Sequence, residues 1–303
     1  SKIALFIRDR ARRQLEWERL YEKSPLSRTI FDQASEAVNL DLKKLCFEEN
    51  DLLDKTEYTQ VAMVTACLAM TRAVESMGLH ADMTAGLSLG EYCAIAVAGG
   101  MCDLDAIRTV RSRGIFMEHA APEGSGAMSA VLGMDAEVIE DVLNGREGVS
   151  IANYNCPGQI VITGEAAAVA EAGTALKEAG ARRVLPLKVS GPFHSPMMRP
   201  AGEELAKVFA GVSMNPLKIP YVANINAEVI TDCGRIEGLL VEQVSGSVRW
   251  QQSVETMIRE GVDTFVEIGP GKTLTGFLVR LIKRKAYHIG SWEEAVQVCE
   301  ELK

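Results

Sequence analysis

Short apolar runs alternate along the chain with stretches in which apolar residues recur every three or four positions. The runs predict buried strands, and the longer period predicts helices with one buried face. Alternation of the two predicts an α/β fold. The expected strands are Ser1–Ile7, Asp82–Gly86, Ile219–Val222 and Thr264–Ile268. The expected helices are Thr59–Met77, Leu89–Ala98 ended by Gly99-Gly100, Asp103–His119, Glu203–Val212, Ser253–Glu260, and a last one opened by Gly269-Pro270-Gly271 and running toward Lys283.

The pattern changes in the middle of the chain, from Gly126 to about Val189. It predicts strand, helix, two strands across the turn Asn155-Cys156-Pro157-Gly158, helix and strand. This order is that of a ferredoxin-like unit. The expected elements are Ala127–Leu132, Asp135–Leu143, Val149–Tyr154, Gln159–Gly164, Glu165–Glu178 and Arg182–Leu187. We therefore expect a small ferredoxin-like subdomain, residues 126–192, inserted into a large α/β domain made of residues 1–125 and 193–303.

Composition narrows the class of protein. The 303 residues carry a formal net charge of −9, and 47% of them are hydrophobic. An acidic chain is a poor binder of nucleic acid, because phosphate neutralisation needs clustered Lys and Arg. The strongly basic exception is Arg8–Arg19, with five arginines. No apolar run approaches the roughly 18 residues that a membrane span needs. We therefore expect neither a nucleic-acid nor a membrane partner.

Seven scattered cysteines form no Cys-x-x-Cys pair, which argues against a zinc site or a dithiol redox motif. Their mostly apolar neighbours predict buried free thiols in a reducing compartment. We expect a cytoplasmic protein without a signal peptide.

The sharpest chemical signal is Gly86-Leu87-Ser88-Leu89-Gly90, which matches the nucleophile elbow G-x-S-x-G. In such an elbow a strand turns sharply into a helix and presents the serine at the apex. The backbone N–H of Leu89 would then be one donor of an oxyanion hole. By itself, a five-residue motif fits an ordinary strand-to-helix turn equally well.

A serine nucleophile needs a base, and the chain has four histidines. His80, His119 and His288 lie in unremarkable places: before a strand, at the end of a helix and among basic residues. His194 lies in the loop Gly191-Pro192-Phe193-His194-Ser195-Pro196, where the prolines restrict its position. We expect His194 to be the base.

Several motifs together resemble the malonyl-CoA:acyl carrier protein transacylase family of type II fatty-acid synthesis. They are Gly86–Tyr92 (GLSLGEY), Arg113-Gly114 with Met117, Asn153–Gly164 (NYNCPGQIVITG), His194 and Glu267–Gly276 (EIGPGKTLTG). The resemblance runs from about Leu20 to Lys283. It implies a hydrolase-like core with a parallel sheet, and an enzyme that transfers malonyl from malonyl-CoA to acyl carrier protein.

The resemblance also implies the role of each site residue. Ser88 takes the malonyl group as an ester, and His194 activates first the serine and later the carrier thiol. The backbone carbonyl of Gln243 orients the histidine in place of a triad acid. Arg113 pairs with the malonyl carboxylate through its guanidinium fork, although the residue alone would fit a solvated helix charge. Met117 and Gln60 correspond to substrate-binding positions, Gln60 at the floor of the site.

Phe193 bears on substrate choice. In related acyltransferases a Phe before the histidine accompanies malonyl preference, and a ring there would crowd an α-methyl branch. We expect malonyl to be preferred over methylmalonyl. Coenzyme A enters as part of the substrate, and no cofactor or metal site is expected.

The segment after the first strand departs from the family. The family has a Gly-Gln-Gly-x-Gln loop there, whose first Gln supplies the second oxyanion N–H, whereas Ile7–Arg19 contains no glycine. Arg and Trp side chains do not fit where backbone must approach a nucleophile. For one choice of codons, Arg8–Glu18 read from the third base give Gly-Gln-Gly-Ala-Gln-Thr-Ala-Gly-Met-Gly. We interpret the segment as a frameshifted reading of the glycine-rich loop, either in the molecule or only in the written sequence.

Two alternatives stay open. A serine hydrolase or thioesterase would use the same elbow with an acid between serine and histidine in chain order, for which Asp141 is available. The second alternative is an acyl-carrier-binding protein that the altered segment has inactivated. Since acyl carrier protein is acidic, an active enzyme needs a local basic patch, and Lys188, Arg199 and Lys272 are suitable members.

Overall fold

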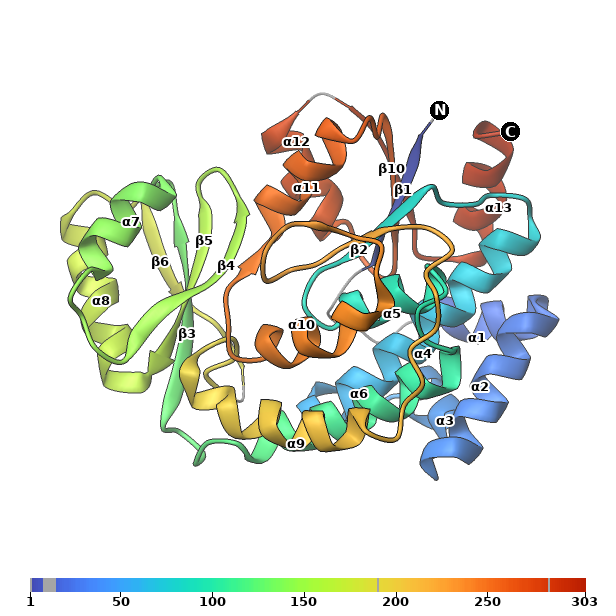
Figure 1. Ribbon diagram of the computed structural model, residues 1–303, viewed down its shortest axis with the longest axis horizontal. Coiled ribbons are helices and arrows are strands. Elements are labelled where there is room, and N and C mark those ends of the chain that lie inside the picture. The colour runs from blue at the N-terminus through green and yellow to red at the C-terminus, as the bar shows by residue number, and fades with distance from the viewer. Residues whose placement is uncertain (1, 8–14, 190, 283) are drawn as a thin grey trace.

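The computed structural model describes residues 2–7, 15–189, 191–282 and 284–303. These residues form a mixed α/β structure with two sheets and, within the described ranges, thirteen α-helices. A larger body holds both ends of the chain, and a smaller body lies beside it (Figure 1). The predicted α/β class is therefore confirmed.

The larger sheet has six strands in the order β11-β10-β1-β2-β7-β8. Neighbouring strands from β11 to β7 are parallel, and β8 pairs antiparallel with β7. Parallel strands gather their carboxyl ends at one edge, which is where ligands of such sheets bind. The bounds are β1 (Ile3–Ile7), β2 (Met83–Gly86), β7 (Tyr221–Val222), β8 (Val229–Ile230), β10 (Thr264–Ile268) and β11 (Lys285–Ile289).

Helices cover both faces of this sheet. Alternate residues of β1 separate the two layers: Leu5 and Ile7 belong to one apolar cluster, and Ala4 and Phe6 to another. The large-body helices are α1 (Leu15–Lys23), α2 (Pro25–Val38), α3 (Leu42–Phe47), α4 (Thr56–Ser76), α5 (Gly90–Val97), α6 (Asp103–His119), α9 (Arg199–Phe209), α10 (Ile236–Gln243), α11 (Trp250–Arg259), α12 (Thr273–Leu281) and α13 (Trp292–Glu301). Short 3₁₀ turns are Leu52–Asp54, Pro196–Met198 and Cys233–Arg235.

The two apolar layers differ in composition. The Leu5 side holds α4, which is buried almost all round its circumference, as a helix in the centre of a core must be. The Phe6 side holds α11 and α12, where the Phe6 ring meets Trp250 edge-on, with ring centroids 5.0 Å apart. The sheet is thus the middle layer of three.

The smaller sheet has the order β6-β3-β5-β4-β9. Its first four strands are antiparallel neighbours, and β9 adds a parallel strand from the larger body. The bounds are β3 (Gly126–Leu132), α7 (Ala136–Leu143), β4 (Val149–Cys156), β5 (Gln159–Glu165), α8 (Ala166–Glu178), β6 (Arg183–Pro186) and β9 (Val248–Arg249). The element order predicted for this region is confirmed.

Some predictions were wrong in detail. The helix expected from Glu203 begins at Arg199, because Pro200 sits in its first turn, where a missing N–H costs nothing. The expected buried thiols hold for Cys46, Cys67, Cys93, Cys156 and Cys299, but Cys233 is half-buried and Cys102 is exposed. The Cys102 sulfur accepts a hydrogen bond from the Asp105 N–H at the start of α6.

The N-terminal helices were not predicted from the sequence. α2 does carry a readable start signal, since Ser24 caps it and Pro25 follows in its first turn. α1 holds Trp17 in the core and pairs Arg19 with Glu293 of α13. No helix in the described part of the chain is both long and apolar enough to span a bilayer.

Candidate active site

The elbow lies between the end of β2 and the start of α5. Ser88 has a φ of 53°, in the left-handed region, which costs a non-glycine residue on the order of 1–2 kcal/mol. A Cβ on Gly86 would lie 1.9 Å from the carbonyl oxygen of Gly90, so position 86 accepts only glycine. Leu89 is the residue immediately before α5, so its N–H belongs to the free amino end of that helix. The predicted strand, turn and helix are therefore present.

His194 faces the serine. Its Nε2 lies 2.7 Å from Ser88 Oγ, and its Nδ1 lies 2.8 Å from the carbonyl oxygen of Gln243. A carbonyl only accepts, so Nδ1 carries the proton and Nε2 is free to accept from the serine hydroxyl. His194 also has a left-handed φ, 60°. Its loop is held where Ser195 Oγ donates to the Pro192 carbonyl at 2.6 Å and Thr163 Oγ1 to the Phe193 carbonyl at 2.7 Å.

The surroundings of His194 keep the imidazole neutral. Burial, and then the positive charge of Arg113, lower its pKa from 6.5 to about 4, against the opposing effect of hydrogen bonds with the backbone of Gln243 and Gly246. A neutral imidazole can take a proton from a hydroxyl, so His194 is in the form of a base throughout the neutral pH range.

Arg113 comes from α6 and is buried beneath the serine. Its guanidinium donates to Gln60 Oε1 at 2.9 Å and to Gln243 Oε1 at 3.0 Å, and one nitrogen lies 3.5 Å from Ser88 Oγ. The same cation lies 5.6 Å from the ring centroid of Tyr92. The solvated helix charge that the residue type alone allows is therefore wrong, because Arg113 is 1% exposed.

Gln60 and Met117 lie beside this arginine. Gln60 Nε2, from α4, contacts Met117 Sδ of α6 at 3.3 Å, and both side chains are buried. The two helices pack closely because Gly114 has no side chain: a Cβ there would lie 2.8 Å from the Thr56 carbonyl oxygen. This approach brings the amide of Gln60 within reach of the guanidinium.

These residues line a cavity of about 720 Å³ between the two bodies. Of the eight residues expected at the site, seven line it: Gln60, Ser88, Leu89, Arg113, Met117, Phe193 and His194. The eighth, Gln243, is fully buried behind His194 and Ser88. A cavity of this size holds a small acyl group together with part of a longer carrier.

The smaller sheet contributes polar residues that the sequence did not single out as site residues. Asn153, Asn155 and Gln159 line the cavity, and Asn155 Oδ1 is buried with no hydrogen-bond partner among the described residues. Their motif was interpreted as a turn and as part of a family signature. Turn formation accounts for Pro157 and Gly158, so Asn153 before the predicted turn and Asn155 at its first position were the available signal.

Asn224 was also missed. It is fully buried, accepts a hydrogen bond from the Ser88 N–H at 2.7 Å and donates one to the Gly86 carbonyl at 2.8 Å. It lies 136 residues from the serine, and no motif surrounds it.

The remaining candidates lie elsewhere. Asp141 is exposed on α7, and the position it would take in a hydrolase triad, at His194 Nδ1, is occupied by the Gln243 carbonyl. His288 Nε2 contacts the Gly269 carbonyl at 2.7 Å. Trp17, near the end of the segment that departs from the family, packs in the core on α1. Residues 8–14, the centre of the segment that we interpret as frameshifted, lie outside the described residues.

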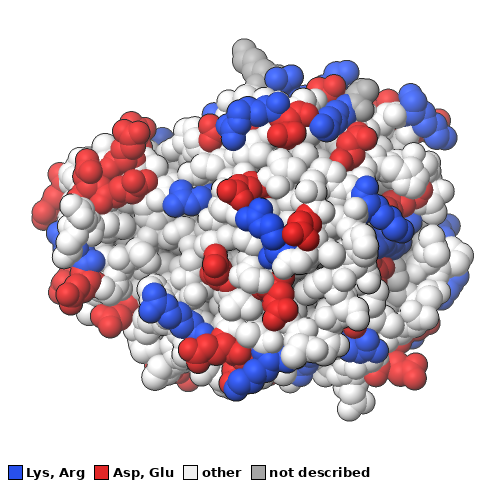
Figure 2. Space-filling view, viewed as in Figure 1, with Lys and Arg blue, Asp and Glu red and all other residues white. Residues whose placement is uncertain are grey.

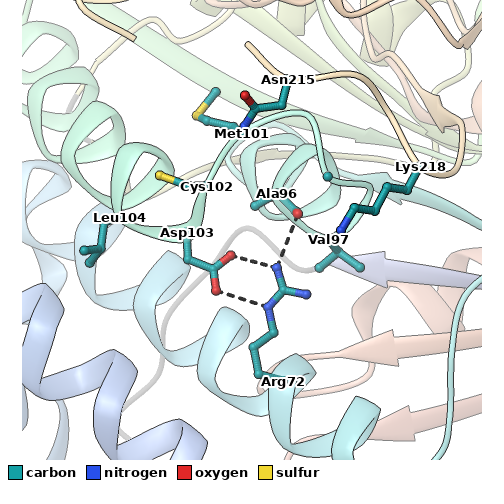
Figure 3. Close-up of a pocket in the computed structure, with 10 residues that line it drawn as sticks. Arg72, Ala96, Val97, Met101, Cys102, Asp103, Leu104, Asn215 and Lys218 are labelled. Atoms are coloured by element: carbon teal, nitrogen blue, oxygen red, sulfur yellow. Dashed lines mark hydrogen bonds and ion pairs between the residues drawn. The ribbon is translucent and has the colours of Figure 1, made fainter. Parts of the chain in front are cut away.

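A second cavity, of about 440 Å³, shares no lining residue with the first. Figure 3 shows Arg72 of α4 reaching its wall, where the guanidinium pairs with Asp103 at 2.8 Å and donates to the Ala96 carbonyl. Arg72 also pairs with Glu75 at 2.7 Å. The arginine therefore joins α4, α5 and α6, and its charge is already compensated.

Comparison with known proteins identifies the family. Residues 18–299 match the family model described as acyl transferase domain. The chain belongs to this family. Among curated relatives, the malonyl CoA-acyl carrier protein transacylase of Bacillus subtilis (strain 168) is 44% identical over 271 residues, which cover 88% of this chain and 85% of that protein.

Solved structures of the acyltransferase family agree with this assignment. A malonyl CoA-acyl carrier protein transacylase from Clostridium perfringens superposes with a TM-score of 0.95 at 35% identity, covering 100% of this chain and 97% of that one. A malonyl-transacylase solved in complex with a type II polyketide synthase acyl-carrier protein superposes with a TM-score of 0.93 at 35% identity, covering 99% and 100%. The family match begins at residue 18, at the end of the segment Ile7–Arg19 that departs from the resemblance.

Proposed function

We propose that this acyltransferase moves the malonyl group from malonyl-CoA to the phosphopantetheine thiol of acyl carrier protein, through a malonyl ester on Ser88. The observation that carries the proposal is the line from Ser88 Oγ to His194 Nε2 and from His194 Nδ1 to the Gln243 carbonyl, with Arg113 buried beside it. The names of the similar proteins agree with it.

The first half-reaction forms the ester. His194 Nε2 takes the hydroxyl proton as Ser88 Oγ attacks the thioester carbonyl carbon, giving a tetrahedral oxyanion. Collapse of the intermediate breaks the carbon–sulfur bond. The proton on His194 passes to the departing thiolate, so coenzyme A leaves as a thiol and His194 returns to its neutral form.

The second half-reaction repeats the chemistry with another thiol. His194 takes the proton of the phosphopantetheine thiol, whose sulfur attacks the malonyl ester. The carbon–oxygen bond to Ser88 breaks, and the proton returns to Oγ. The Gln243 carbonyl favours both steps because it holds the Nδ1 proton and stabilises the imidazolium that forms each time.

Arg113 is proposed to select an acyl group that carries a free carboxylate. Its guanidinium lies 3.5 Å from Ser88 Oγ, so the free carboxylate of a bound malonyl group falls within its reach. Gln60 Oε1 and Gln243 Oε1 hold the fork in place, and Met117 closes the wall beside Gln60. Phe193 lines the same cavity, and its ring is proposed to crowd an α-methyl branch.

The oxyanion is proposed to bind the N–H of Leu89, and the resemblance implies a second donor in the segment after β1, which lies outside the described residues. Support comes from Ile7, which pairs with Gly86 and whose carbonyl accepts from the Leu87 N–H at 3.2 Å. The chain therefore leaves β1 beside the elbow, where a glycine-rich loop is needed. We retain the hypothesis that Ile7–Arg19 is a frameshifted reading of that loop, and the start of the family match at residue 18 agrees with it.

Intact-mass measurement with peptide mapping of residues 1–23 tests this hypothesis. If the alteration exists only in the written sequence, the measured mass is expected to differ from that of the written residues, and the map is expected to contain a glycine-rich peptide. A mass that matches the written residues would overturn that version and leave an altered loop in the molecule. Loss of one oxyanion donor then lowers kcat on the order of 10²–10³-fold, as in a well-studied protease.

The carrier protein is proposed to dock at the cavity mouth. Lys188 lines the cavity, and Lys272 immediately precedes the lining residue Thr273. Figure 2 shows acidic side chains gathered over the end of the molecule that α7 occupies, so an acidic partner is repelled there on this face. Arg199 begins α9 and is exposed.

The architecture has a proposed division as well. Residues 1–125 with 193–303 would form a hydrolase-like domain and residues 126–192 a ferredoxin-like subdomain. The strand order β6-β3-β5-β4 supports the second description, because it is the 4-1-3-2 order of that fold with both helices on one apolar cluster. We also propose a cytoplasmic location, supported by seven free cysteines, and catalysis without a cofactor.

Trapping the intermediate tests the function. Incubation with [¹⁴C]malonyl-CoA is expected to label the protein, with the label mapped to Ser88, and added acyl carrier protein is expected to discharge it as malonyl-carrier. A Ser88→Ala variant is the matched control and takes no label. Rapid discharge to water without an acceptor would favour the hydrolase alternative, and an unlabelled wild-type protein would leave only carrier binding.

A further inference from the structure

The backbone of the nucleophile elbow is held by side chains that come from other parts of the chain. β2 ends at Gly86 and α5 begins at Gly90, so the Ser88 N–H belongs to neither element. It donates to Asn224 Oδ1 at 2.7 Å, and the Ser88 carbonyl accepts from Gln243 Nε2 at 2.7 Å. Both polar backbone groups of the nucleophile are thus satisfied by buried amides.

The Asn224 side chain supplies hydrogen bonds to the elbow backbone at the point where the pairing of β2 with β7 ends. β7 pairs with β2 at Thr84–Tyr221 and Ala85–Val222, so the same register brings Asn224 beside the residue before Ser88. There the elbow turns away, and the next ladder bonds between backbones are lost. The Asn224 side chain replaces them with one acceptor for the Ser88 N–H and one donor, Nδ2, to the Gly86 carbonyl at 2.8 Å.

Glu91 holds the backbone of Asn224, and Gln243 approaches the Asn224 side-chain amide. Glu91 Oε1 accepts from the Asn224 N–H at 2.9 Å and from Gln243 Nε2 at 3.3 Å, and Gln243 Nε2 lies 3.4 Å from Asn224 Oδ1. Glu91 is fully buried in the first turn of α5, three residues after the nucleophile. Burial raises its pKa from 4.5 to about 7, against the opposing effects of the Asn224 N–H, the Gln243 amide and the Arg113 charge.

We propose that Asn224 is a positioning residue for the nucleophile: its side-chain amide bridges the Gly86 carbonyl and the Ser88 N–H and holds Ser88 in the left-handed conformation that aims Oγ at His194. The inference rests on the proposed role of Ser88 and adds a residue that touches neither substrate nor the reacting atoms. The bridge needs one acceptor and one donor on the same side chain, which an amide offers at every pH and a carboxyl group offers only when it is protonated.

The test uses the full-length protein with Asn224→Ala and Asn224→Asp. The matched control is Asn226→Ala, since Asn226 lies in the same loop and its side chain hydrogen-bonds Glu228 rather than the elbow. Two rates are measured per folded molecule: acylation by [¹⁴C]malonyl-CoA, and inactivation by a fluorophosphonate, a reagent that attacks reactive serines and has no carboxylate. Dependence of acylation on malonyl-CoA concentration separates the rate constant from KM.

Both rates are expected to fall together by about 10- to 100-fold in Asn224→Ala, which corresponds to an unsatisfied buried donor and acceptor. KM for malonyl-CoA stays within about twofold, because Arg113 and Gln60 are unchanged. Asn226→Ala behaves as wild type. Wild-type rates in Asn224→Ala, or a rise in KM without loss of fluorophosphonate reactivity, would overturn the proposal.

Asn224→Asp keeps the test decisive if the alanine variant does not fold. An ionised Asp accepts from the Ser88 N–H but opposes the Gly86 carbonyl, whereas a protonated Asp can donate to it. The activity of Asn224→Asp relative to wild type is therefore expected to rise as the pH falls from 8 to 5.5. A constant ratio contradicts the bridge.

Other titratable or charged groups lie around this position: Glu91 and Tyr92 of α5, Arg113 of α6, Tyr221 of β7 and His194. Their effect on activity is present in the wild type too, so dividing the activity of the variant by that of the wild type at each pH removes it.

Failure of this inference is distinguishable from failure of the proposed function. If wild-type protein carries no malonyl label on Ser88, the function fails whatever the variants do. If the wild type is labelled at Ser88 and both Asn224 variants react at its rate, the positioning role alone is wrong.

Discussion

Replacement of Arg113 by alanine removes the proposed partner of the malonyl carboxylate. Arg113 is 1% exposed and reaches within 3.5 Å of the attacking oxygen, so the substrate carboxylate pairs with it away from solvent. Loss of one partner from a buried, hydrogen-bonded charge pair costs about 2–5 kcal/mol. At 1.36 kcal/mol per decade, kcat/KM for malonyl-CoA is expected to fall by about 30- to 5,000-fold.

Acetyl-CoA has the same thioester but no carboxylate, so its acylation tests the reasoning. In Arg113→Ala its kcat/KM is expected to change by less than about tenfold, because acetyl has no carboxylate to lose its partner and only the hydrogen bonds from the guanidinium to the Gln60 and Gln243 amide oxygens are lost. The malonyl-to-acetyl ratio therefore collapses. Arg113→Lys should fall between wild type and alanine, since an ammonium keeps the charge and loses the fork.

Competition assays with both thioesters, followed by mass spectrometry of the acylated Ser88 peptide, measure this ratio directly. Arg108→Ala is the control, because Arg108 lies on the same helix but is exposed, 3.6 Å from Asp105. An equal loss for malonyl-CoA and acetyl-CoA would refute carboxylate pairing. It would instead mean that Arg113 acts through the position or charge state of His194.

Four further outcomes are expected. Because burial holds the pKa of His194 near 4, kcat/KM for acylation should stay level down to about pH 5 and fall around pH 4; a midpoint between 6 and 7 contradicts this. Phe193 should make malonyl-CoA better than methylmalonyl-CoA by about 10- to 200-fold in kcat/KM, and the reverse order would exclude its proposed role. Glu91 has a folded pKa of about 7 against 4.5 unfolded, so its stabilising contribution is complete below pH 4.5 and is lost as the pH rises through 7. Glu91→Gln should then lack that decline in a Tm-versus-pH series, and parallel curves would show that Glu91 does not titrate there. Lys272→Glu should raise KM for acyl carrier protein while acylation by malonyl-CoA stays unchanged, and an unchanged carrier KM would move the docking surface elsewhere.

Local patterns predicted many of the elements. β10 coincides with the expected Thr264–Ile268, and α6 with Asp103–His119. The N-terminal helices were missed although α2 carries a capping serine and a proline in its first turn. α1, α2 and α3 follow one another without a strand between them and pack on each other and on α4, so the chain shows no strand–helix alternation there.

Candidate site residues divide in the same way. The elbow is a local signal, because one pentapeptide contains the glycines that its own geometry demands. The resemblance indicated Gln243, whereas nothing in its residue type did: its contact with His194 is through a backbone carbonyl, which every residue has. Asn224 remained invisible for a related reason, since a lone asparagine after a short strand has the composition of an ordinary turn.

The sequence by itself determined the α/β class, the element order of the smaller sheet and the turn at Ser88. Each of these depends on residues close together in the chain, where periodicity and glycine sterics act. Only the tertiary structure decided that Arg113 is buried rather than solvated and that the Asn224 side chain bonds the elbow backbone at Gly86 and Ser88. Those outcomes depend on contacts between residues far apart in the chain: Ser88 lies more than 100 residues from both His194 and Asn224. The type of a side chain does not reveal which distant group will pack against it.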